Sequence, residues 1–107
     1  MTYEECVNAA REGKPVKSWY IDGAVRVEHV YQRIVRVGVN FIEKNGELIP
    51  SEYVELLSPG GGSVTNSGPE RCSLATEEEL KSVIDKQNSD WYRRVIFDRG
   101  REAPAGK

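Results

Sequence analysis

The chain has one histidine and two cysteines among its 107 residues, which limits the chemistry that it can support. Structural zinc sites use Cys and His ligands in closely spaced pairs, and Cys6, His29 and Cys72 are far apart in the sequence. Two distant cysteines do not make a disulfide framework either, so we expect free thiols. Cys6 is predicted to be buried by a helix, and Cys72 is predicted in a more open loop. We therefore expect no metal ion and no cofactor.

Long apolar runs and a strong charge of one sign are also missing. No stretch approaches the roughly 20 apolar residues that cross a bilayer, and the acidic beginning MTYEECVNAAREG lacks the basic-then-apolar order of a signal peptide. The net charge is −2 and the isoelectric point is about 5.5, whereas nucleic-acid-binding domains are usually basic. We expect a cytoplasmic protein without a membrane partner.

The main fold signal is an alternation of apolar and polar residues across residues 25–42. β-branched and aromatic residues occupy most odd positions, which is typical of a half-buried strand. A straight strand of this length would span roughly 55–60 Å, but a domain of about 100 residues has a radius of gyration near 13 Å. The alternation falters between His29 and Arg33. We expect the strand to bend there and to pass between two sheets.

A helix and a hairpin are predicted before this segment. Thr2 and Glu5 fit a capping box, and Gly13 is a typical helix end, so the pattern predicts a helix over residues 3–12. A strand over residues 16–21 then meets the turn pair Asp22-Gly23. Taken as a two-residue turn, this pair sets Tyr20 opposite Val25. It also sets Trp19 opposite Arg26, in a cation–π contact.

A second turn signal, Asn45-Gly46, predicts the register of a longer hairpin. Opposite charges meet in this register, apolar residues meet, and an aromatic ring covers a strand glycine. The predicted pairs are Ile42–Ile49, Gly38–Tyr53, Val37–Val54, Arg36–Glu55, Val35–Leu56 and Ile34–Leu57. The strands are predicted near residues 24–37, 39–44 and 47–57. The most buried residues are expected to be Val27, Val35, Val37, Val54, Leu56 and Leu80.

The last third of the chain is predicted to hold one short strand and a second helix. The segment 58–62 is a loop, and residues 63–65 can form a short closing strand. Thr76 and Glu79 fit another capping box, which predicts a helix near residues 77–88. Asn88, Ser89 and Asp90 should end it, and residues 91–97 are then predicted as a last strand. A helix that continues to Phe97 is the alternative, and residues 98–107 form a polar tail.

These elements predict an α+β fold in a single domain over residues 1–97. The two architectures that fit are a small, strongly bent antiparallel meander and an SH3-like barrel. Either would carry an N-terminal helix and a C-terminal helix.

Several short patches within residues 1–72 carry a resemblance. They are Tyr3-Glu4-Glu5, Gly13 before the first strand, Glu55-Leu56-Leu57, Ser63-Val64-Thr65 and Pro69-Glu70. On these patches the chain resembles small uncharacterised proteins of conjugative and phage-like elements in gut Firmicutes. The resemblance implies a bacterial mobile-element setting, and it implies nothing about a catalytic residue.

We expect a non-enzymatic protein-interaction module, because Trp, Tyr and Arg are enriched at protein contacts. In a mobile element, its partner would be a host factor or a defence protein. The candidate binding residues are Trp19, Arg26, Trp91, Tyr92, Arg93 and Arg94. Whether Trp19 lies on the surface or in the core is left open. The alternative function is single-stranded nucleic-acid binding through arginines interleaved with aromatics. A small enzyme that uses Cys72, with His29 as base, is the third.

Overall fold

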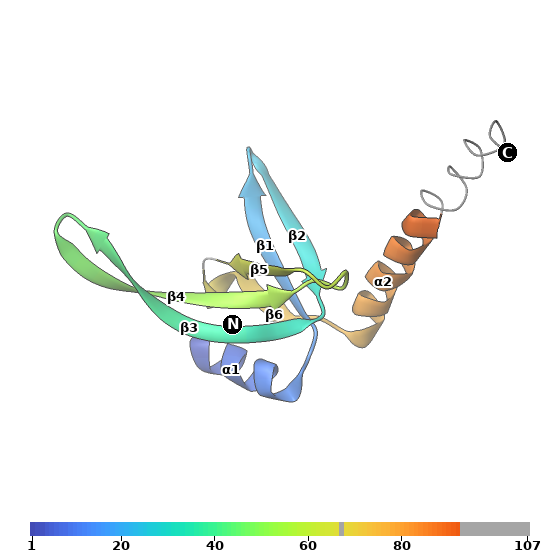
Figure 1. Ribbon diagram of the computed structural model, residues 1–107, viewed down its shortest axis with the longest axis horizontal. Coiled ribbons are helices and arrows are strands. Elements are labelled where there is room, and N and C mark those ends of the chain that lie inside the picture. The colour runs from blue at the N-terminus through green and yellow to red at the C-terminus, as the bar shows by residue number, and fades with distance from the viewer. Residues whose placement is uncertain (67, 93–107) are drawn as a thin grey trace, which may run out of the picture.

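The computed structural model describes residues 1–66 and 68–92. The fold is α+β (Figure 1), with the elements α1 (Tyr3–Glu12), β1 (Val16–Asp22), β2 (Val25–Tyr31), β3 (Arg33–Lys44), β4 (Glu47–Leu57), β5 (Ser63–Asn66), η1 (Pro69–Arg71), β6 (Cys72–Leu74) and α2 (Glu77–Tyr92). The strands form two antiparallel sheets of three strands each, in the orders β2-β1-β6 and β3-β4-β5. They close no barrel within the described residues, so the bent meander is the better of the two predicted architectures.

The helix α1 has the predicted bounds and caps. The Thr2 hydroxyl accepts a hydrogen bond from the Glu5 amide at 3.1 Å, and the Glu5 carboxylate accepts one from the Thr2 amide at 2.8 Å. Gly13 ends the helix in the left-handed region, with φ of 65°. Met1 fixes the start of the helix to the sheet, because its ammonium group donates to the carbonyls of Pro69 and Cys72 at 3.1 and 2.7 Å.

The predicted change of sheet occurs at Gln32, between β2 and β3. The chain leaves one sheet at Tyr31 and enters the other at Arg33, so the expected bend between residues 29 and 33 is confirmed. The strand boundary expected at residue 38 is wrong, because β3 runs through Gly38 without a break. The Tyr53 ring covers this glycine so closely that a Cβ atom would lie 2.6 Å from its hydroxyl.

The turn of the β1–β2 hairpin lies one residue later in the chain than predicted. The turn is Gly23-Ala24, so Asp22 pairs with Val25 and Tyr20 pairs with Val27. Gly23 has φ of 64°, whereas Ala24 is not in the positive-φ region. A turn with positive φ at its first central residue alone needs glycine there, and Asp22 remains in the strand. Because the pairing shifts by two residues, each side chain keeps its predicted sheet face.

The β3–β4 hairpin has the predicted register from Arg36 to Lys44. Asn45 and Gly46 have φ of 53° and 81°, as a turn with two positive-φ residues requires. A β-bulge between Ile34 and Arg36 changes the pairs below it, so the predicted Val35–Leu56 and Ile34–Leu57 pairs are wrong. The observed pairs there are Ile34–Leu56 and Arg33–Leu57.

The core lies where the two sheets and α1 meet. It comprises Cys6, Ala9, Val16, Tyr31, Ile34, Val54, Leu56 and Cys72. The predicted burial is confirmed for Val54, Leu56 and Leu80. Val27 and Val37 are only half-buried. Val35 is exposed, which contradicts the prediction, because the bulge leaves it without a cross-strand partner.

Cys72 is buried, although an open loop was predicted around it. It begins β6, a three-residue strand that the sequence pattern did not indicate, and it pairs with Ser18.

The second helix is longer than predicted. The Thr76 capping box is present, with a 3.0 Å hydrogen bond from the Glu79 amide to the Thr76 hydroxyl. α2 then continues through Asn88, Ser89 and Asp90, so the predicted end there is wrong. These residues are weak helix formers, but no Gly or Pro interrupts the segment. The last strand cannot begin at residue 91, because α2 extends to Tyr92. Residues 93–107, which include the rest of that strand and the polar tail, lie outside the described residues.

None of the helices in residues 1–66 and 68–92 is both long and apolar enough to cross a membrane.

Candidate functional site

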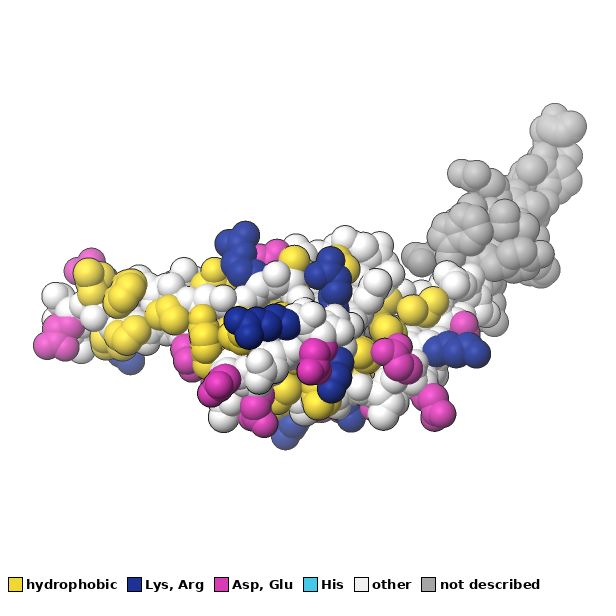
Figure 2. Space-filling view, turned by 90° about the horizontal axis from the view of Figure 1, so that it is seen from below, with side chains coloured by type: hydrophobic (Ala, Val, Ile, Leu, Met, Phe, Trp, Pro, Cys, Tyr) yellow, Lys and Arg dark blue, Asp and Glu magenta, His cyan; other side chains and the backbone are white. Residues whose placement is uncertain are grey.

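The outer half of the β3–β4 hairpin, residues 39–52, projects beyond the core, and we call it the arm (Figure 1). Its strands extend about 20 Å past the last core pair, at the rise of a β-strand. Large apolar side chains of the arm are exposed to solvent: Val39, Phe41, Ile42, Leu48 and Ile49. Figure 2 shows hydrophobic side chains gathered at this end of the molecule, with acidic residues at the tip. A solvated sheet surface normally carries polar residues on at least one face.

Both faces of the arm carry apolar side chains. Residues directly opposite each other share a face, so Phe41 and Pro50 lie on one face, and Ile42 and Ile49 lie on the other. The first face continues the surface that carries the core pair Val37–Val54. The arm therefore extends the core surface into solvent, and its opposite face adds one apolar pair, Ile42–Ile49, among polar residues.

The two edges of the arm differ in their capacity to accept another strand. Lys44 and Glu47 flank a two-residue turn, so they form a hydrogen-bonded pair, and such pairs alternate along the ladder. Phe41 and Pro50 are then a non-hydrogen-bonded pair, with their backbones directed outward. Pro50 has no N–H to donate, which closes the outer edge of β4. On β3, the backbone groups of Val39, Phe41 and Glu43 face outward with all their donors and acceptors.

No described neighbour occupies the open edge of the arm. β3 is the terminal strand of its sheet, and α1 packs against the inner part of β3 (Figure 1). On the β4 side, β5 covers only Val54–Leu57. An exposed, apolar edge strand of this kind is a template for pairing with another chain.

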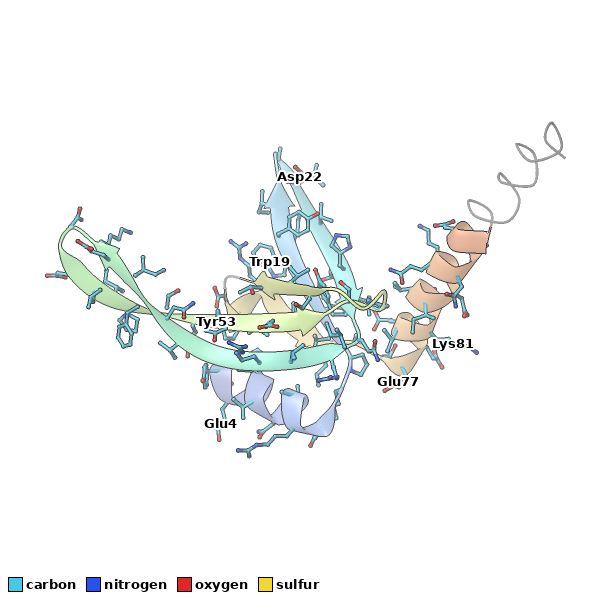
Figure 3. The ribbon with its side chains drawn as sticks, in the orientation of Figure 1. Glu4, Trp19, Asp22, Tyr53, Glu77 and Lys81 are labelled. Atoms are coloured by element: carbon cyan, nitrogen blue, oxygen red, sulfur yellow. The ribbon has the colours of Figure 1, made fainter. Side chains whose placement is uncertain are left out.

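Trp19 is the second feature, and it lies in the angle between the two hairpins (Figure 3). The predicted cation–π contact is confirmed, with the guanidinium carbon of Arg26 4.3 Å from the centre of the indole ring. The directly opposed residue is Glu28, and Arg26 approaches diagonally. Arg71 lies 4.8 Å from the same ring and was not predicted. Trp19 is half-buried and lies outside the core cluster, with the side chains of Arg26 and Arg71 against its ring.

The position of Arg71 beside Trp19 could not be predicted from the sequence, because it depends on β6, which the sequence pattern does not indicate. Ser18 pairs with Cys72, and continuing this register places Arg71 beside Trp19. A strand of three residues shows too little alternation to be recognised in the sequence.

None of the described contacts places the other predicted binding residues beside Trp19. Trp91 and Tyr92 end α2, and the structure describes their backbone only. Arg93 and Arg94 lie outside the described residues. Of the six candidates, the structure brings together Trp19 and Arg26.

Cys72 and His29 lie in one row across the sheet, on either side of Ser18. Their backbones are thus two strand spacings apart, about 9–10 Å. The Cys72 thiol donates to the Ser18 hydroxyl at 3.9 Å and to the Gly68 carbonyl at 4.0 Å, whereas His29 Nε2 lies 3.4 Å from the Tyr20 hydroxyl. Burial raises the pKa of the Cys72 thiol. The reactive form of a cysteine is the thiolate, which a raised pKa disfavours at neutral pH.

Cys6 has the same character. Burial, with the neighbouring Cys72, raises its pKa to about 11. Both thiols are free and buried in the core, so they pack as small apolar side chains. Among the described residues, no cluster of His, Cys, Asp or Glu has an arrangement that could hold a metal ion.

Comparison of the chain with protein-family models, with curated proteins and with solved structures finds no match.

Proposed function

We propose that this protein is a non-enzymatic protein-interaction module and that the arm is its contact surface. The observation that carries the proposal is the exposure of apolar side chains on the arm, with Phe41 66% and Leu48 70% exposed on one face and Ile42 53% exposed on the other. Burying one such side chain is worth about 1.5–3 kcal/mol. A contiguous exposed apolar patch is costly for a protein that remains alone in water, and such patches mark interaction sites.

The partner contributes an extended segment to the open edge of β3. In this mode of recognition, main-chain hydrogen bonds supply affinity, and alternate side chains supply specificity. The outward backbone groups of Val39, Phe41 and Glu43 are the pairing sites. Apolar side chains of the added strand would cover Phe41 on one face and Ile42 on the other.

The setting of this contact is also part of the proposal. The resemblance of residues 1–72 to mobile-element proteins would make the partner a cytoplasmic host factor or defence protein. The contact mode does not depend on this origin, because it follows from the strand edge alone.

Single-stranded nucleic-acid binding is the second candidate. It would use exposed arginines beside aromatic rings, as Arg26 lies beside Trp19. We rank it second because the guanidinium groups already occupy the surroundings of that ring. Arg36 is also engaged, at 3.6 Å from Glu55.

Affinity capture from a host lysate, with and without nuclease, compares matched pairs of variants. Phe41→Ser with Leu48→Ser should abolish capture of the protein partner and leave the melting temperature nearly unchanged. The control pair is Ile21→Ser with Val25→Ser, at the tip of the other hairpin, where both residues are also exposed. Equal capture by both pairs contradicts the proposal. Capture that nuclease removes favours the nucleic-acid alternative.

The edge is tested by proline substitution. Val39→Pro removes an outward N–H and leaves the β3–β4 ladder intact, so capture should be lost while the fold is kept. Asn40→Pro is the contrasting variant, because it removes an inward donor and should lower the melting temperature. If capture survives Val39→Pro, the partner does not add a strand to β3. Dimerisation of the purified protein that Val39→Pro abolishes would identify a second copy of the chain as the partner.

A further inference from the structure

The surroundings of Trp19 hold an unbalanced pair of charges. Arg26 belongs to β2, on one side of β1, and Arg71 precedes β6, on the other side. Their guanidinium carbons lie 4.3 and 4.8 Å from the centre of the indole ring. Two cations from opposite flanks thus share one aromatic side chain, and contact with the ring restricts both guanidinium groups.

Neither guanidinium group has a carboxylate within salt-bridge distance in the described part of the chain, although acids are near. Glu28 is opposite Trp19 in the strand register. Glu70 precedes Arg71, but its carboxylate folds back over Gly68, where even a Cβ atom would collide with it. Other basic residues do find partners, and the salt bridges among the described residues are Lys14–Glu12, Lys17–Glu79 and Arg36–Glu55.

The chemistry of this arrangement favours a carboxylate ligand. A guanidinium group that stacks on a ring keeps its N–H edge free, and this edge matches the two oxygens of a carboxylate. A bound anion would also relieve the repulsion between two cations held near each other. We propose that Arg26, Trp19 and Arg71 form a binding site for the carboxylates of an acidic peptide segment. This inference rests on the proposed function, since the segment would belong to the protein partner.

An acidic peptide fits the site better than single-stranded nucleic acid does. Base stacking needs an open aromatic face, and guanidinium groups flank the Trp19 ring. Tyr20 is also engaged, because its ring stacks on His29 with the centroids 5.6 Å apart. The overall charge of −2 would weaken long-range attraction of a polyanion, whereas a short peptide needs only the local pair of arginines.

The test is a titration of the full chain with hexaglutamate, followed by NMR. The readouts are the indole Nε1–H signal of Trp19, assigned with Trp91→Phe, and the arginine Nε–H signals. Saturable shifts should appear at these groups. Arg26→Gln and Arg71→Gln should each raise the Kd about tenfold. Arg26→Lys should also weaken binding, because lysine keeps the charge and loses the planar pair of donors.

Arg33→Gln is the matched control, because Arg33 is exposed and takes part in no cation–π contact among the described residues, and it should leave the Kd within about twofold. A Kd that rises equally in Arg33→Gln and Arg26→Gln would mean general charge attraction and would overturn the proposal. The proposal would also be overturned if hexaglutamate caused no saturable shifts, or if a ten-nucleotide oligothymidylate bound more tightly at the same groups. If Arg71→Gln does not fold, the Arg26 variants decide.

The arm is tested separately from this site. Val39→Pro should bind hexaglutamate as the unmodified chain does, and loss of capture by Val39→Pro does not depend on Arg26. Failure of one experiment therefore leaves the other interpretable.

Discussion

The inner and outer halves of the β3–β4 hairpin have similar residues in different surroundings. Leu56 and Leu48 occur on the same strand and the same sheet face, yet Leu56 is fully buried and Leu48 is 70% exposed. The inner half meets α1 and the second sheet in the core. The outer half has no such cover among the described residues. An apolar strand face in the sequence predicts that the face is covered. Only the fold tells whether another part of the same chain covers it.

The back of the hairpin differs less between the two halves. In the inner half, it carries the pair Arg36–Glu55, which suits a solvated surface. In the outer half, the exposed pair Ile42–Ile49 is the apolar part of this face, between the polar pairs Asn40–Ser51 and Lys44–Glu47. The front face, which carries Leu48, is therefore the larger apolar surface of the arm.

The two leucines give the largest expected difference. Leu56→Ala removes fully buried methyl groups and should lower the free energy of unfolding by about 2–5 kcal/mol. Leu48→Ala should change it by less than about 0.5 kcal/mol, because the side chain is exposed in the free protein. Denaturant unfolding followed by circular dichroism measures both values. Similar losses in the two variants would show that the arm packs against the body.

Residue pairing in this hairpin was predictable, and its surroundings were not. The turn pair Asn45-Gly46 has a strong conformational preference, so it determined the register as far as Arg36. The bulge at Val35 was missed because it depends on how β3 enters the sheet. Arg71 was missed, and Cys72 was wrongly placed in an open loop, because β6 pairs with residues more than 50 positions earlier in the chain. Local patterns do not contain such contacts.

Thiol reactivity compares the two regions without changing the fold. Cys6 and Cys72 are buried with raised pKa values, so both should react slowly with an aromatic disulfide reagent near pH 8. A thiol introduced on the arm by Leu48→Cys should react about 100-fold faster or more, because it needs no opening of the core. The absorbance of the released thiolate measures the rates. Fast reaction of Cys72 in the native protein would revive the enzyme alternative.

Gly38 lies at the boundary between the two halves. Gly38→Ala places a Cβ atom against the Tyr53 ring, which must move, so the expected cost is about 1–3 kcal/mol. In a Tyr53→Ala background the same change should cost much less. A double-mutant cycle of unfolding free energies measures the coupling. Additive effects would mean that the ring does not restrain the backbone there.

The helix caps should give the smallest effect, and they concern the body alone. Hydrogen bonds from Thr2 hold the pKa of Glu5 below its usual value of 4.5, and those from Thr76 do the same for Glu79. This contribution to stability is present above about pH 4.5 and is lost as the pH falls through the lower folded pKa. Thr2→Ala should cost about 1 kcal/mol at neutral pH, because it removes the hydroxyl that caps the helix. Glu5→Gln removes the titrating carboxylate, whose main partner is the backbone N–H of Thr2, and should reduce the loss of stability in acid. Unfolding midpoints between about pH 6 and pH 3 measure this loss, and an unchanged acid slope in Glu5→Gln would contradict the assignment to this cap.

Site-specific photocrosslinking in cells tests the central claim, that the arm is a contact surface, most directly. A photoreactive phenylalanine analogue replaces Phe41 on the arm or, as the control, the exposed Lys81 on α2. We expect a crosslinked protein adduct from position 41, none from position 81, and loss of the adduct when Val39→Pro closes the strand edge. Equal crosslinking at both positions, or an adduct that survives Val39→Pro, would contradict it.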